Sequence, residues 1–76
     1  MPIEEIIFLM GGRISARKQL ASGREVISCT GPLELKENQY PFIVSAIEDG
    51  IRHLYCAIKI NSTFVYWPWE ASDEQP

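Results

Sequence analysis

Residues 42–60 decide the fold, and they read Phe-Ile-Val-Ser-Ala-Ile-Glu-Asp-Gly-Ile-Arg-His-Leu-Tyr-Cys-Ala-Ile-Lys-Ile. Two apolar, β-rich runs flank the turn sequence Glu48-Asp49-Gly50. An Asp-Gly pair in this position predicts a hairpin, because a type I′ turn requires positive φ at both central residues. Pairing Glu48 with Ile51 divides the strand residues between two faces. One face carries Phe42, Val44, Ala46, Ile51, His53, Tyr55 and Ala57, and the other carries Ile43, Ser45, Ile47, Arg52, Leu54, Cys56 and Ile58.

A helix is the competing interpretation of the same stretch. Apolar residues recur with alternating spacings of four and three from Tyr40 to Ile58, and Pro41 stands near a suitable helix start. In that helix an interior Gly50 would cost about 1 kcal/mol, and the many β-branched residues would lose side-chain freedom. We therefore predict a hairpin over residues 42–60.

A second hairpin is predicted over residues 13–30. The side chains alternate in character on both sides of Ala21-Ser22-Gly23. Gly23 supplies the positive φ that a hairpin loop of three to five residues commonly needs. The alternative is a short helix over residues 16–22, with Ser15 as N-cap and Gly23 as its stop. The hairpin is the favoured interpretation.

The two outer segments are also assigned to strands. Residues 3–10 hold three isoleucines and a phenylalanine in a short run, which favours a strand. A helix is the alternative, because Pro2 and the two glutamates near the start of the run suit a helix start, and Gly11-Gly12 suits a helix stop. Residues 64–67 predict a last strand, which Pro68 stops or confines to a sheet edge.

These segments predict a mainly β fold with five to six short strands and room for one short helix. The architecture is a small antiparallel meander or a small barrel of the SH3 or oligonucleotide-binding type. The chain has 76 residues, of which 46% are hydrophobic, and this suits one small core. We assign residues 1–69 to a single β domain and residues 70–76 to a flexible acidic tail.

The net charge and the cysteine content limit the cellular compartment and the classes of partner that we expect. A net charge of −3 argues mildly against a general nucleic-acid coat. No stretch resembles a signal peptide or a membrane span, so we expect a cytoplasmic protein without membrane contact. In that compartment Cys29 and Cys56 are expected to be reduced and buried, with a single disulfide as the alternative.

No group of residues forms a recognisable catalytic or metal site, and we expect a protein that is not an enzyme. His53 is the only histidine, and it falls on an apolar hairpin face. Cys56 is three residues away, so strand alternation places its thiol on the opposite face. Two distant cysteines and one histidine match no metal spacing, and Gly11-Gly12 matches no phosphate-binding loop. We therefore expect no metal and no cofactor.

The aromatic segment Tyr66-Trp67-Pro68-Trp69 predicts a protein-binding surface, because Tyr and Trp are frequent interface anchors. Strand alternation sends Tyr66 and Trp67 to opposite faces, so at least one of Trp67 and Trp69 is expected to be exposed. The leading hypothesis is a non-enzymatic protein-binding module of accessory, regulatory or inhibitor type. It would act through a sheet edge and through Tyr66, Trp67 and Trp69. Surplus aromatic surface on so short a chain also predicts a homodimer.

Nucleic-acid binding by a small β-barrel is the alternative hypothesis. Residues 13–24 carry four cations and no acid. A positive strip beside aromatic side chains is the usual arrangement for binding single strands. Four cations are few, however, and the acidic tail would repel phosphate, so this hypothesis is the weaker one. Its candidate residues are Arg13, Arg17, Lys18 and Arg24.

Overall fold

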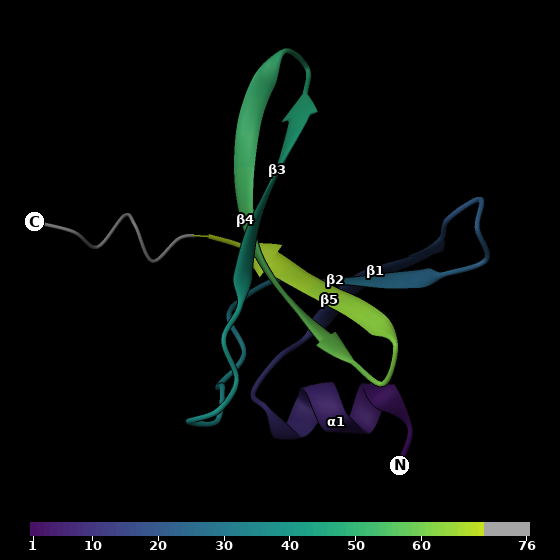
Figure 1. The fold of residues 1–76 in the computed structure, drawn as a ribbon, viewed down its shortest axis with the longest axis vertical. Helices are drawn as coiled ribbons and strands as arrows, with labels where there is room; N and C mark the ends of the chain where they lie inside the picture. Colours follow the sequence, from purple (N-terminus) through teal and green to yellow (C-terminus); the bar gives the residue numbers. More distant parts are fainter. Residues whose placement is uncertain (70–76) are drawn as a thin grey trace, which may run out of the picture.

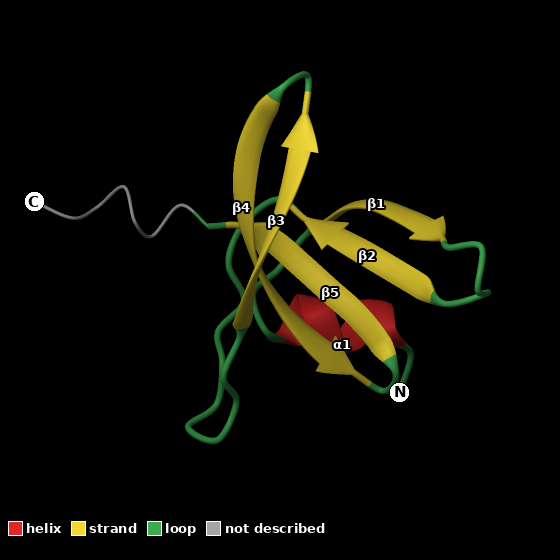
Figure 2. Ribbon diagram, turned by 45° about the horizontal axis from the view of Figure 1, so that its top comes forward, coloured by secondary structure: helices red, strands yellow, loops and turns green. Residues whose placement is uncertain are grey.

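One five-stranded sheet with a single helix against one of its faces makes up the structure, a computed structural model that describes residues 1–69 (Figures 1 and 2). The acidic tail predicted for residues 70–76 lies outside the described residues. Within residues 1–69, no helix is long and apolar enough to cross a membrane. The elements in chain order are α1 (Ile3–Leu9), β1 (Ile14–Gln19), β2 (Glu25–Cys29), β3 (Phe42–Glu48), β4 (Ile51–Ile60) and β5 (Thr63–Pro68).

The strands lie side by side in the order β1-β2-β5-β4-β3. β5 pairs antiparallel with β4 but parallel with β2, so a crossover that contains β3 and β4 joins β2 to β5. β1 and β3 form the two edges, and the sheet stays open instead of closing into a barrel. The predicted mainly β fold, with five or six short strands and one short helix, is confirmed. The parallel β2–β5 pair departs from the predicted antiparallel meander. The residue pattern of a strand does not show which other strands become its neighbours, so the sequence did not predict this pair.

Both predicted hairpins are present. β3 and β4 pair in the predicted register, with Glu48 opposite Ile51. Asp49 and Gly50 adopt φ values of 54° and 79°, as a type I′ turn requires. β1 and β2 form the other hairpin, so the short helix considered for residues 16–22 is excluded.

Residues 3–10 were predicted as a strand, and this is wrong: the chain forms helix α1 there. Two glutamates occupy the first turn, where they interact favourably with the helix dipole. The helix ends before Gly11, whose φ is 85°. A helix of seven residues depends on tertiary packing, and here that packing outweighs the β-branched preference. The residues that face the core have helical spacing: Ile3, Ile6, Ile7 and Met10.

The core lies between α1 and one side of the sheet, which we call the covered face; the other side is the open face (Figure 2). α1 and the loop before β3 approach each other closely at Gly12. A Cβ at this position would lie 2.2 Å from Leu33 Cδ2 and 3.0 Å from Ile7 Cγ2, so any larger residue would force the buried Leu33 side chain to shift. The buried cluster consists of Ile7, Ile27, Cys29, Leu33, Cys56, Ile58, Ile60, Val65 and Trp67.

The turn at Gly50 gives a direct test of the β3–β4 hairpin. Gly50 has a φ of 79°, so we expect Gly50→Ala to lower the free energy of unfolding by about 1–2 kcal/mol through backbone strain. Gly31→Ala is the matched control, because a Cβ at Gly31 would meet open space and the residue has no positive φ. It should change stability by no more than about 0.5 kcal/mol. Urea unfolding measures both variants, and equal effects would contradict the assigned turn.

Candidate functional site

The aromatic segment is placed differently from its prediction. Tyr66 and Trp67 do point to opposite faces, as expected. Trp67 is only 4% exposed and belongs to the core, while Trp69 is half-buried against it. The expectation of an exposed indole is therefore wrong, and Trp67 is not accessible to a partner. The physical reason is that β5 lies in the centre of the sheet, so Pro68 ends the strand without marking a sheet edge.

Trp69 is held close to the base of the β3–β4 hairpin. Its backbone N–H donates a hydrogen bond to the Leu54 carbonyl oxygen at 3.0 Å. This contact extends the pairing of β4 and β5 beyond Pro68, which lies opposite Tyr55. The backbone that follows β5 is thus tied to β4 at Leu54.

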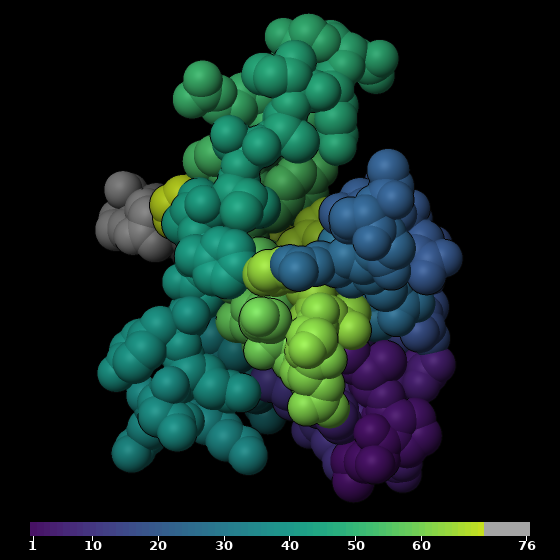
Figure 3. Space-filling view, turned by 45° about the vertical axis from the view of Figure 1, so that its right-hand side comes forward, coloured from purple at the N-terminus to yellow at the C-terminus, as the bar shows by residue number. Residues whose placement is uncertain are grey.

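The open face carries two pairs of aromatic rings. The Phe42 and Phe64 rings meet edge to face with centroids 6.0 Å apart, and the Tyr55 and Tyr66 rings do so at 5.3 Å. Edge-to-face contacts of this kind contribute about 0.5–1.5 kcal/mol each beyond burial. In Figure 3 the surface of β5 is visible between β3 and the β1–β2 hairpin. A shallow apolar depression on this face is lined by Val26, Phe42, Val44, Ala57, Phe64 and Tyr66.

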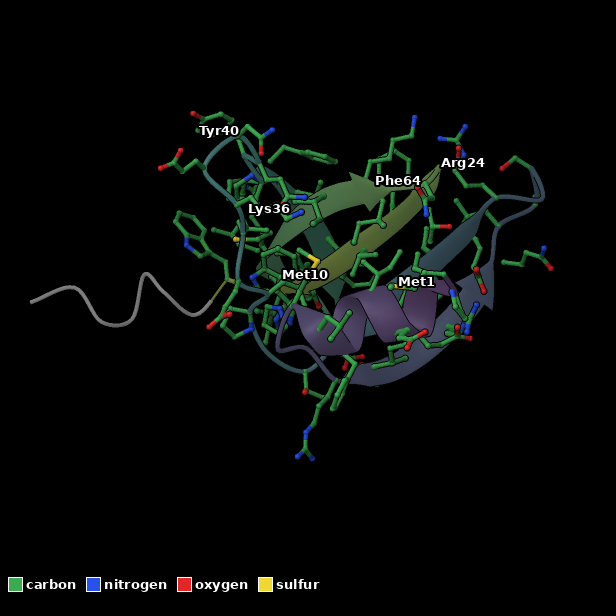
Figure 4. All side chains as sticks on the ribbon, turned by 90° about the horizontal axis from the view of Figure 1, so that it is seen from below. Met1, Met10, Arg24, Lys36, Tyr40 and Phe64 are labelled. Atoms are coloured by element: carbon green, nitrogen blue, oxygen red, sulfur yellow. The ribbon has the colours of Figure 1, made fainter. Side chains whose placement is uncertain are left out.

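Two cations lie over one of these rings. Arg24 Cζ is 5.4 Å from the centroid of the Phe64 ring, and Lys59 Nζ is 5.8 Å from it. Figure 4 shows Arg24 beside Phe64 at the end of the β1–β2 hairpin. Lys18 lies opposite Val26 in the β1–β2 pairing, which places it on the open face as well. Positive charge therefore borders the aromatic surface.

The cations predicted as one strip do not share one face: Lys18 and Arg24 border the open face, whereas Arg17 lies on the covered side. Arg17 lies opposite Ile27, a core residue of the covered face, and its guanidinium pairs with the carboxylates of Glu4 and Glu25. A backbone hydrogen bond and the Arg17 guanidinium hold the pKa of Glu4 below its usual value. Those carboxylates in turn raise the pKa of Arg17. Arg17 thus joins α1 to the β1–β2 hairpin and is already neutralised.

His53 lies near the carboxylate of Glu48. Its Nε2 is 3.7 Å from Glu48 Oε1, and the Tyr55 hydroxyl donates to Glu48 Oε2 at 3.1 Å. Desolvation, and secondarily Glu48, raises the pKa of Tyr55. In the β3–β4 register His53 and Cys56 fall on opposite faces, as predicted. Within residues 1–69, no three His, Cys, Asp or Glu side chains gather closely enough to hold a metal ion.

Both cysteines are free thiols in the core. Burial raises the pKa of Cys29 and of Cys56 above the usual value for a thiol. A buried, protonated thiol is a poor nucleophile, so these residues act as small apolar side chains.

The β3–β4 hairpin projects beyond the rest of the sheet, and we call its residues 42–54 the arm (Figure 1). β5 pairs with β4 only from Tyr55 onward, so among the described residues β3 is the one strand beside the outer part of β4. Every residue of the arm is exposed, whichever face of the hairpin its side chain lies on. Alternation predicted which side chain lies on which face, but not that both faces would be bare. The large apolar residues of the arm that are more than a third exposed are Phe42, Ile43, Val44, Ile47, Ile51 and Leu54.

The fold and the site thus define an open mixed sheet, backed by one short helix, with a projecting apolar arm and an aromatic open face. No family model, curated protein or solved structure matches this chain.

The placement of Trp67 is testable by fluorescence. In a Trp69→Phe variant the emission reports Trp67 alone, and we expect acrylamide to quench it several-fold less than in the urea-unfolded chain. Trp67→Ala should lower the free energy of unfolding by about 3–5 kcal/mol, because it leaves a large cavity in the core. Tyr66→Phe is the control, since it retains the ring on the open face. Efficient quenching of Trp67 in the folded protein would overturn its place in the core.

Proposed function

We propose that this protein is a non-enzymatic protein-binding module, of accessory, regulatory or inhibitor type, that docks through the arm and its free edge. The observation that carries the proposal is the presence of six large apolar side chains, exposed on both faces of one hairpin. Contiguous apolar surface of this kind is typical of interaction sites in small domains. Three of the six lie on each face, so a partner that clasps the arm would bury both.

The edge of the arm supports the same proposal. An unpaired edge strand offers a row of backbone N–H and C=O groups to another strand. Natural proteins block such edges with charged side chains, prolines or bulges. Residues 42–47 contain no charge and no proline, and β3 pairs with β4 without a bulge. The edge is therefore suited to accept a strand.

The structure changes the part that the C-terminal aromatic segment plays in this proposal. Tyr66 lies on the open face beside Tyr55, where a partner that reaches the base of the arm would contact it. Trp67 lies in the core and Trp69 packs against it, so the docking surface proposed here does not include Trp67. The two free, buried thiols suit a reducing compartment and so support a cytoplasmic location.

Site-specific photo-crosslinking in cells tests the proposal. A photoreactive phenylalanine analogue in place of Ile47, which is 66% exposed on the arm, should give defined crosslinks to protein. The matched control is the same analogue at Leu20, an apolar residue that is 46% exposed in the β1–β2 loop. We expect discrete adducts from the arm and at least tenfold less from the control. No adducts from the arm, or the same adducts from both positions, would contradict docking through the arm.

A second candidate function is the binding of a single-stranded nucleic acid on the open face. It is favoured by the two cations, Arg24 and Lys59, that lie over the Phe64 ring. Bases stack on aromatic side chains while neighbouring cations hold the phosphates. This surface differs from the predicted strip, because Arg17 is neutralised on the covered side.

Binding of a fluorescent oligothymidylate at low and rising salt tests this second candidate. Arg24→Gln should weaken binding and lower the slope of log affinity against log salt by about 1, because one phosphate contact is lost. Arg13→Gln removes the same charge from a residue that lies over no aromatic ring among those described, and it should have little effect. The candidate fails if no binding is seen at low salt, or if both variants weaken it equally.

A further inference from the structure

The free edge of β3 is complementary to itself. We infer that the partner of the arm is a second copy of this chain, with β3 pairing antiparallel to β3 of that copy about a two-fold axis at Ser45. This inference rests on the proposed function, since it names the occupant of the same edge. It follows from the register of the hairpin, from the residues that bound the strand, and from the side chains that would meet.

The register determines which backbone groups of β3 are free. In an antiparallel pair, hydrogen-bonded and non-hydrogen-bonded residue pairs alternate. A two-residue type I′ turn is closed by a hydrogen-bonded pair, here Glu48 and Ile51. Counting back along β3, Ile43, Ser45 and Ile47 fall in the other class, so their backbone groups point away from β4.

An independent contact supports this assignment. Ser45 lies opposite Leu54, and the Leu54 carbonyl oxygen accepts a hydrogen bond from the Trp69 backbone N–H. Leu54 therefore directs its backbone toward the β5 side, away from β3. Its partner Ser45 must then direct its own N–H and C=O to the free edge.

One antiparallel register uses all three outward-facing residues. With Ser45 at the axis, Ser45 pairs with its counterpart, and Ile43 pairs with Ile47 of the second copy. A register centred on Ile43 would oppose Ser45 to Pro41, which has no N–H to donate. A register centred on Ile47 would oppose Ser45 to Asp49, which lies in the turn. Registers centred on Val44 or Ala46 would oppose Ile47 to Pro41 or Ile43 to Asp49. The strand ends thus select the Ser45-centred pairing.

The side chains suit the same register. On the covered side, Ile43 meets Ile47 twice, and β-branched cross-strand pairs stabilise antiparallel sheets. The two Ser45 hydroxyls meet at the axis, where neither bulk nor charge opposes close approach. On the open side, Val44 meets Ala46. Glu48 is the one charged residue of β3, and it lies far from its counterpart because the pairing places it opposite Phe42.

Engineered disulfides test the register directly. A hydrogen-bonded antiparallel pair has a Cα–Cα distance of about 5.5 Å, which a disulfide spans. Ser45→Cys should therefore give a covalent dimer under mild oxidation, and so should a mixture of Ile43→Cys and Ile47→Cys chains. Ile43→Cys alone is the control and should crosslink at least tenfold less, because its counterpart lies four residues along the strand. The native thiols are buried and should give no dimer in the unaltered protein.

Sedimentation equilibrium of the intact chain gives the second measurement. We expect a dimer at tens of micromolar, and Ser45→Lys should raise its dissociation constant at least tenfold while leaving the circular dichroism unchanged. Ser22→Lys, in the exposed β1–β2 loop, is the matched control and should leave the dimer intact. A monomer at all concentrations, together with no Ser45→Cys crosslink, would overturn the inference. In that case, adducts of another protein at Ile47 would leave the protein-binding proposal standing, and their absence would remove both.

Discussion

The central position of β5 is the constraint on which the rest of the structure depends. β5 pairs with β2 on one side and with β4 on the other, so it joins the N-terminal half of the sheet to the β3–β4 hairpin. Its residues Val65 and Trp67 are among the most buried of the chain because strands flank them on both sides and α1 covers their face. The same arrangement displaces β3 to the edge. The buried tryptophan and the free edge therefore have a common origin.

The exposure of the arm follows from the lengths of the elements. α1 has seven residues and β4 has ten. At about 1.5 Å per helical residue and about 3.3 Å per strand residue, the helix is about 10 Å long and the strand about 33 Å. One such helix covers only part of β4. Cys56, Ile58 and Ile60 are buried accordingly, while residues 51–54 are exposed.

The two candidate surfaces share residues. Phe42 and Val44 belong to the arm, and both also line the depression on the open face. A strand added at the edge of β3 would therefore extend the aromatic surface next to Phe64 and its two cations. Arg17 adds no unpaired charge to this surface, because it is paired with Glu4 and Glu25 on the covered side.

The features that the sequence by itself determined are those set by neighbouring residues. Asp49-Gly50 predicted the turn, its register and the faces of the β3–β4 hairpin, because positive φ at two adjacent positions is a local steric requirement. Gly23 between two alternating segments predicted the β1–β2 hairpin in the same way. These assignments need no knowledge of the rest of the chain.

Only the tertiary structure decided the state of residues 3–10, the burial of Trp67 and the pairing of Arg17. Residues 3–10 suit a strand or a helix locally, and the helix forms because its apolar stripe fits the covered face. Trp67 is buried because a parallel neighbour, β2, lies beside β5 although the two strands are far apart in sequence. Arg17 pairs with Glu4 because the tertiary structure brings α1 next to the β1–β2 hairpin. Each outcome depends on which distant surfaces meet, and local spacing carries no information about that.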